Sequence, residues 1–288
     1  MMKLRKSTQA NQIGPIRSSQ ALHQLGQFWL WLLIGGVLWG GVLWLISHRI
    51  GAVSGSAETP LWLQNLYFAG LYFWLLLLIF TFRKPHWPRW PAWLAQALSG
   101  YALGTGLLLV FWLVFAIRGH LQIQAPTLNS LQILHAVLLG WLVASIEEAV
   151  FRGVTLELLG QRFQLLTALS GQALLYAGLH LLQPQAFSLS GLINLSGLFA
   201  VGWFLGLLRV YTGQLACSTG LHAGWISLSM LGAWSQALNW SPRINLWSGN
   251  GNPAQGLSGM FCFMLLSAWI WHLLPAHRQL WHNEAKRQ

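Results

Sequence analysis

Eight apolar runs, each of at least 19 residues, follow one another along this chain of 288 residues. They lie at 28–46, 62–82, 92–117, 128–157, 163–183, 189–208, 213–233 and 256–274. A helix rises ~1.5 Å per residue, so about 20 residues cross the ~30 Å hydrocarbon layer of a bilayer. Only 7% of the residues are charged and 55% are hydrophobic, too few charges to cover a water-exposed surface. The sequence therefore predicts an all-α, polytopic membrane protein with about eight transmembrane helices.

The polar segments around these runs suggest the domain organisation. Residues 1–27 are basic, rich in Ser and Gln and free of acids, so we expect a cytosolic tail there. Residues 28–288 then form a single membrane domain, without a second soluble domain. The loop 234–255 is rich in Trp and Pro and is predicted to lie in the membrane interface, where Trp is enriched.

The basic residues predict topology rather than nucleic-acid binding. The net charge is +11, but the 16 basic residues stand singly or in small groups between apolar runs. A nucleic-acid surface needs them clustered on one water-exposed face. With the N-terminus inside, 13 basic residues fall on the inner side, or 12 if Arg152 is counted as buried, and three on the outer side: Arg49, Arg118 and Arg243. This bias predicts that both termini are cytosolic, in a plasma or thylakoid-type membrane.

An adjacent pair of carboxylates, Glu147 and Glu148, lies in the fourth apolar run, in a chain with five acids in all. On a helix, Glu148 and Arg152 are four residues apart and share a face, whereas Glu147 is rotated by ~100°. A charge in mid-membrane costs at least ~2.5 kcal/mol, so an acid there indicates function by default. The structural alternative is a buried ion pair that only holds helices together.

Two histidines are placed to join this pair. His180 lies in the fifth predicted span and His222 in the seventh. Counted from the inner ends of the spans at ~1.5 Å per residue, Glu147, His180 and His222 lie ~18, ~26 and ~15 Å deep. We therefore predict one buried polar site formed by helices 4, 5 and 7. The two cysteines, Cys217 and Cys262, are too few for a disulfide framework or a Cys-based metal site.

Three short motifs on these spans resemble those of a known family. They are Glu-Glu-xxx-Arg at Glu147, Glu148 and Arg152, aromatic-xxx-His at Tyr176 and His180, and a third motif that begins at His222. In this order they resemble the CAAX prenyl protease type II and bacteriocin-processing (CPBP or Abi) family of intramembrane endopeptidases. The resemblance covers about residues 128–233. Tyr176 stands where the family motif has Phe, and Ile226 stands where many members have Asn.

The resemblance implies a glutamate-dependent intramembrane endopeptidase. Glu147, assisted by His180, would activate the attacking water. His222 would donate a hydrogen bond to the developing oxyanion, and Glu148 with Arg152 would orient these groups. The substrate would be a membrane-associated peptide or protein, and no cofactor is required. Ile226 cannot donate a hydrogen bond, so the indole N–H of Trp225 is a candidate replacement for the missing Asn.

Three alternatives remain open from the sequence. The two Glu and two His residues are also possible zinc ligands, which would give a metal-dependent form of the same peptidase. A non-catalytic membrane scaffold or immunity-like factor that keeps the family fold is favoured by Ile226. Intramembrane Glu and His also serve as proton relays, so a small-molecule transporter is the third alternative.

Overall fold

The computed structural model describes residues 15–54, 61–82, 90–182 and 188–274. Residues 1–14 of the predicted tail lie outside the described residues. Residues 15–27, which were also expected in the tail, form the first turns of a helix that begins at Pro15 and ends at Ser54. The first helix is therefore about twice as long as the apolar run that predicted it.

The helices follow the predicted apolar runs. They are α1 (Pro15–Ser54), α2 (Leu61–Phe82), α3 (Trp90–Ile117), α4 (Ser130–Glu148), α5 (Leu156–Arg162), α6 (Leu165–Leu179), α7 (Leu189–Thr212), α8 (Ala216–Trp234), α9 (Asn245–Ser248) and α10 (Leu257–Leu273). A π-helical turn, η1 (Ala149–Thr155), joins α4 to α5 without a break. The short 3-10 turns are η2 (His180–Leu182), η3 (Pro242–Ile244), η4 (Gly249–Gly251) and η5 (Pro253–Gln255).

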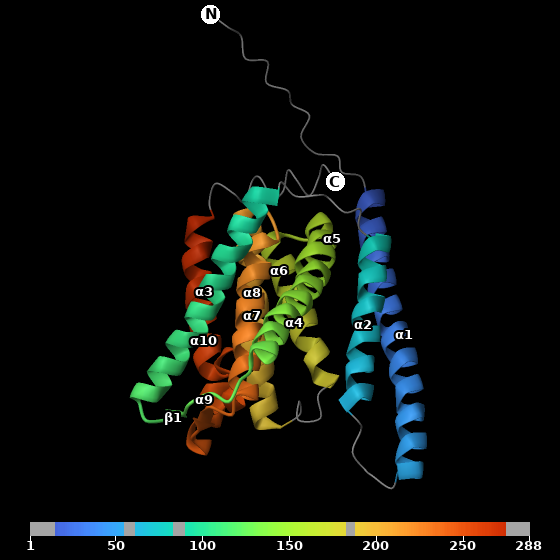
Figure 1. The fold of residues 1–288 in the computed structure, drawn as a ribbon. Helices are drawn as coiled ribbons and strands as arrows, with labels where there is room; N and C mark the ends of the chain where they lie inside the picture. Colours follow the sequence, from blue (N-terminus) through green and yellow to red (C-terminus); the bar gives the residue numbers. More distant parts are fainter. Residues whose placement is uncertain (1–14, 55–60, 83–89, 183–187, 275–288) are drawn as a thin grey trace, which may run out of the picture.

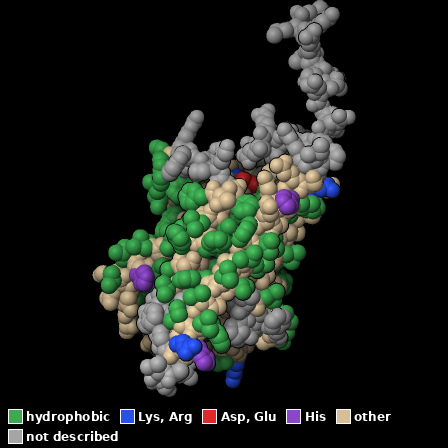
Figure 2. Space-filling view, turned by 90° about the vertical axis from the view of Figure 1, so that its right-hand side faces the viewer, with side chains coloured by type: hydrophobic (Ala, Val, Ile, Leu, Met, Phe, Trp, Pro, Cys, Tyr) green, Lys and Arg blue, Asp and Glu red, His purple; other side chains and the backbone are tan. Residues whose placement is uncertain are grey.

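Within the described residues, four helical segments are long and apolar enough to cross a membrane: Ser19–Ile46, Trp90–Ile117, Ser130–Arg162 and Leu189–Thr212. Shorter apolar helices lie at Ala69–Phe82, Leu165–Leu179 and Leu257–Leu273. Hydrophobic side chains cover most of the face in Figure 2, and the few charged ones lie near its upper and lower ends. The chain is thus an integral membrane protein with a mostly helical fold, whereas the count of eight spans stays a prediction.

The helices form one bundle with α7 and α8 in its interior (Figure 1). Helix α8 packs against α3, α4 and α7, and α7 packs in addition against α6 and α10. Helices α1 and α2 pair with each other at one side of the bundle, where α1 also contacts α5. The three predicted motifs lie on α4 with η1, on α6 with η2, and on α8. Of these elements, η1, α6 and α8 contact α7.

Glycines allow α3 and α8 to approach at backbone distance. A methyl group added at Gly100 or Gly104 of α3 would collide with the carbonyl oxygens of Cys217 and Leu221 on α8. Gly220 of α8 meets the backbone of α3 in the same way. Small residues at such positions are typical of helix pairs in membranes, because close van der Waals packing is what holds them together. This packing fixes the helix that carries His222.

Replacing Gly104 by Val is expected to destabilise the bundle, because the new side chain overlaps the backbone of α8. Overpacking of this kind costs about 1–3 kcal/mol. Gly106→Val is the matched control, since nothing lies within 4 Å of a methyl group at that position. Thermal unfolding of the two purified variants in detergent measures the difference. Equal Tm values for both variants would contradict this account of the α3–α8 contact.

The loop 234–255, which is predicted to lie in the membrane interface, folds back onto the bundle. Its strand β2 (Leu238–Trp240) pairs antiparallel with β1 (Leu121–Ile123), a two-stranded ribbon that the all-α prediction did not contain. Farther along, η5 packs against α7 and α10. A methyl group at Gly197 of α7 would collide with the backbone of Gln255. The end of this loop is therefore a wall of the bundle interior.

Candidate functional site

The helix that carries the carboxylate pair changes its winding directly after the pair. Asn129 and Gln132 form a capping box at the start of α4, which then runs to Glu148. In the following π turn the amide of Leu156 donates to the carbonyl of Phe151, five residues earlier. Such turns occur frequently at functional sites. The apolar run 128–157 predicts one helical span and does not predict this π turn.

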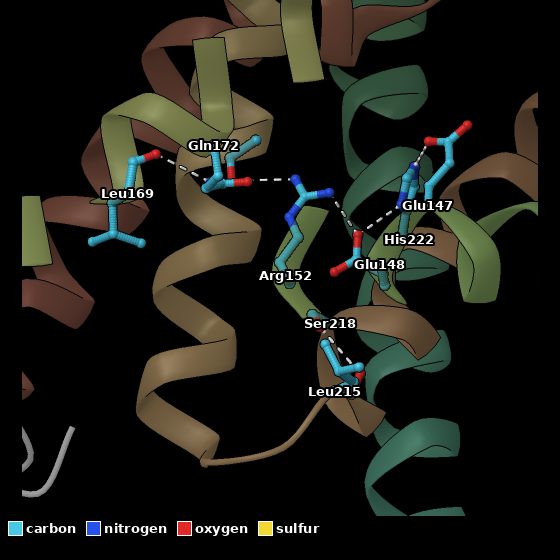
Figure 3. A network of polar contacts seen from close by, with 9 residues as sticks. Glu147, Glu148, Arg152, Leu169, Gln172, Leu215, Ser218 and His222 are labelled. Atoms are coloured by element: carbon cyan, nitrogen blue, oxygen red, sulfur yellow. Dashed lines mark hydrogen bonds and ion pairs between the residues drawn. The ribbon is translucent and has the colours of Figure 1, made fainter. Parts of the chain in front are cut away.

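Glu148 and Arg152 form a fully buried ion pair. Arg152 Nη1 lies 2.9 Å from Glu148 Oε1, and both side chains are 0% exposed. Arg152 Nη2 also donates to the carbonyl of Gly202 on α7, at 3.2 Å. Gln172 Nε2 of α6 donates to the same carbonyl at 2.8 Å. In Figure 3 the Arg152 guanidinium lies between Glu148 and Gln172. Its hydrogen bonds therefore link Glu148, at the end of α4, to Gly202 of α7.

Tyr176 takes the aromatic position of the second motif. Its ring centroid lies 4.7 Å from the guanidinium carbon of Arg152, a cation–π arrangement. The same ring packs edge-on near His180 and His222, with centroid distances of 5.4 and 6.2 Å. The aromatic ring of Tyr therefore makes contacts that a Phe ring would also make, and the departure from the family motif is accommodated.

His222 lies between the two carboxylates (Figure 3). Its Nδ1 is 3.0 Å from Glu148 Oε1, and its Nε2 is 3.8 Å from Glu147 Oε2. An ionised carboxylate only accepts hydrogen bonds, so Nδ1–H is the donor toward Glu148. In the neutral imidazole Nε2 is then an acceptor. The oxyanion role expected for His222 therefore requires the protonated ring.

His180 is oriented in a similar way. It ends α6, and its Nδ1 lies 3.0 Å from the backbone carbonyl of Tyr176. A carbonyl oxygen can only accept, so Nδ1 carries the hydrogen and Nε2 of the neutral ring is again an acceptor. Both imidazoles in their neutral forms thus present a basic nitrogen.

A cavity of about 200 Å³ brings these residues together. Glu147 of α4, His180 at the start of η2 and His222 of α8 all line it. Glu147 keeps 24% of its side chain exposed, whereas Glu148 keeps none and does not line the cavity. The two adjacent carboxylates therefore differ in access, as the helical phase predicted.

A third acid, Glu157, lies away from this site. Glu157 Oε1 of α5 is 3.1 Å from Arg209 Nη2 of α7. The side chains are 17% and 10% exposed, so the pair is largely shielded from solvent. It joins α5 to α7 and contributes no group to the cavity.

The indole N–H of Trp225, the candidate replacement for the missing Asn, has a hydrogen-bond partner in the structure. Ile226 lines the cavity, as the sequence position suggested. Trp225 also lines the cavity, and its indole Nε1–H donates to Asn252 Oδ1 at 3.2 Å. Asn252 itself lines the cavity, from the loop between η4 and η5. The three motifs do not include Asn252 and so did not predict it as a site residue, although the Gly249-Asn-Gly-Asn-Pro253 stretch is a strong turn signal.

The residues present do not fit a zinc site. A catalytic zinc needs three protein ligands, and within 15–54, 61–82, 90–182 and 188–274 no three His, Cys, Asp or Glu side chains are placed to hold a metal. Glu148 is in addition paired with Arg152, whose positive charge would repel a cation. No chemical step through a metal is therefore assigned to these residues.

Comparison with known proteins finds a family match over part of the chain. The model of the family described as Rce1-like, type II CAAX prenyl endopeptidase Rce1-like, matches residues 129–228. No curated protein and no solved structure matches the chain. The matched segment contains all five predicted site residues: Glu147, Glu148, Arg152, His180 and His222. Over this segment the chain is similar to the Rce1-like CAAX prenyl endopeptidases, and the family resemblance found in the motifs is confirmed.

Proposed function

We propose that the chain is a glutamate-dependent intramembrane endopeptidase. One observation carries the proposal: a carboxylate and two oriented imidazoles, from three different helices, line a single cavity within an integral membrane protein. The family match supports a protease of the CAAX type. The cavity supplies the proton acceptors that peptide hydrolysis requires.

In this proposal Glu147 is the general base. It is the carboxylate with access to the cavity, and it removes a proton from the water that attacks the scissile carbonyl. The protonated Glu147 then gives this proton to the leaving amine as the C–N bond breaks. His180 Nε2, held by the bond from Nδ1–H to the backbone of Tyr176, is a second acceptor for that water. His222 stabilises the oxyanion when its ring is protonated. Glu148 and Arg152 orient His222 and do not touch the substrate.

The remaining cavity wall favours an apolar substrate segment. Leu198, Val201 and Leu205 of α7 line it together with Phe263 of α10. Aliphatic and aromatic walls bind apolar groups by excluding water from both surfaces. We therefore propose a membrane-associated peptide or protein with apolar residues near the scissile bond, without a metal or other cofactor.

The test compares the membrane proteomes of cells that lack the chain and are rescued with either wild-type or Glu147→Gln protein. The expected result is an uncleaved precursor that accumulates only with the Gln variant, because an amide cannot act as the base. This precursor would also identify the substrate.

A second outcome favours the scaffold alternative. If both proteins rescue equally and no precursor differs between the two proteomes, the proposal is wrong. A scaffold needs the fold and not the carboxylate, so it would keep its phenotype with the Gln variant. Equal amounts of the two proteins in the membrane are required for the comparison.

A further inference from the structure

We propose that Asn252 supplies the amide hydrogen-bond donor for the oxyanion, in place of the Asn that Ile226 replaces. This inference rests on the proposed peptidase function. It concerns a residue outside the three motifs and outside the segment matched by the family model.

The motif residues that line the cavity offer few hydrogen-bond donors. Both imidazoles use Nδ1–H elsewhere, as described above, so their neutral forms offer only acceptors. Ile226 has no polar atom, and the hydrogen of Trp225 Nε1 is used by Asn252. A tetrahedral intermediate needs preorganised donors where its negative charge develops. The motif residues alone do not provide such donors when the histidines are neutral.

The Asn252 amide is oriented by its hydrogen bond with Trp225. Indole Nε1 is a donor only, so the group that faces Trp225 must be the carbonyl oxygen Oδ1. The Nδ2 group is consequently turned away from Trp225. In the part of the chain that the structure describes, the Asn252 side chain makes no other hydrogen bond. Two N–H donors are thus available at a residue that lines the cavity.

The backbone on both sides of Asn252 is conformationally constrained. Gly249, Asn250 and Gly251 have φ values of 56°, 56° and 98°, a left-handed bend that glycines on either side make accessible. Pro253 then restricts Asn252 to extended backbone, and Asn252 has φ −116° and ψ 90°. The following turn, η5, packs against α7 and α10. The amide is therefore presented by a constrained loop rather than by a free one.

The test measures kcat and KM for the precursor protein that accumulates in Glu147→Gln cells, with purified variants in proteoliposomes. Asn252→Ala and Asn252→Asp are each expected to lower kcat by about 10²- to 10³-fold, the effect of losing one oxyanion donor, with KM little changed. Asp is isosteric and still accepts the bond from Trp225. It therefore keeps the bond to Trp225, removes the donor and places a negative charge beside the oxyanion, which disfavours the oxyanion further.

A second variant asks whether an amide at the family position restores the function. Adding Ile226→Asn to Asn252→Ala is expected to recover about tenfold or more of the lost kcat, a gain that a purely structural role of Asn252 does not predict. Thermal unfolding checks that each variant is folded.

Three results would overturn the inference. The first is a turnover of Asn252→Ala within about threefold of wild type. The second is that Asn252→Asp keeps wild-type turnover while Asn252→Ala is impaired. The third is that adding Ile226→Asn to Asn252→Ala gives no gain in kcat. In each case the precursor still depends on Glu147, so the peptidase proposal survives. If no precursor accumulates in Glu147→Gln cells, the proposed function fails first and this inference fails with it.

Discussion

Purified Glu147→Gln protein is expected to lose about 10²- to 10⁴-fold in turnover of its precursor substrate while it keeps the Tm of the wild type. Glu147 lines the cavity, keeps 24% of its side chain exposed and lies 3.8 Å from His222 Nε2. Gln preserves the shape and removes the base. Initial rates in proteoliposomes and thermal unfolding in detergent give the two measurements.

The matched control for this prediction is His135→Gln. His135 is exposed on the same helix, lies beside the ring of Trp234 in a tilted arrangement and does not line the cavity. Its replacement should leave turnover unchanged. Rates for Glu147→Gln close to those of the control would show that Glu147 is not the base.

Replacing Arg152 by Met is expected to destabilise the protein by about 3–5 kcal/mol, because it leaves the Glu148 carboxylate buried without its cation. Both side chains are 0% exposed, so water cannot compensate. Arg152 is also bonded to Gly202, and its loss separates α4 from α7. Thermal unfolding in detergent measures the effect.

The double variant Glu148→Gln/Arg152→Met separates the charge from the packing. It removes both charges, and the Gln side-chain oxygen can still accept from His222 Nδ1. We expect it to recover much of the stability lost in Arg152→Met, since replacing a whole buried ion pair is often neutral. A double variant less stable than Arg152→Met would contradict the view that the unpaired carboxylate causes the loss.

The local part of the site was accessible from the sequence because it depends on helical periodicity. Glu148 and Arg152 are four residues apart, and the structure contains their ion pair. The depth argument for His180 and His222 uses only the rise per residue and the ends of the spans, and both residues do line the cavity with Glu147. Neither step needs knowledge of how the helices pack.

The rest of the site depends on contacts between distant segments, which no local pattern reports. Trp225 and Asn252 are 27 residues apart, and their bond exists only because the loop folds back onto α7 and α10. Trp in that loop predicts a place in the membrane interface, but it does not indicate which helices the loop contacts. The π turn after Glu148 likewise has no composition signal that separates it from an α-helix.

The carbonyl of Gly202 gives the buried charge an anchor that substitutions in α7 cannot delete. It accepts hydrogen bonds from both Arg152 and Gln172, and it belongs to the backbone. Every amino acid at position 202 would carry the same oxygen, whereas a side-chain acceptor would be lost by a single codon change. Only bulk is restricted there, because an added methyl group would lie 3.1 Å from the ring of Tyr176. The positioning of the guanidinium is thus robust to mutation on the α7 side and vulnerable at Arg152 itself.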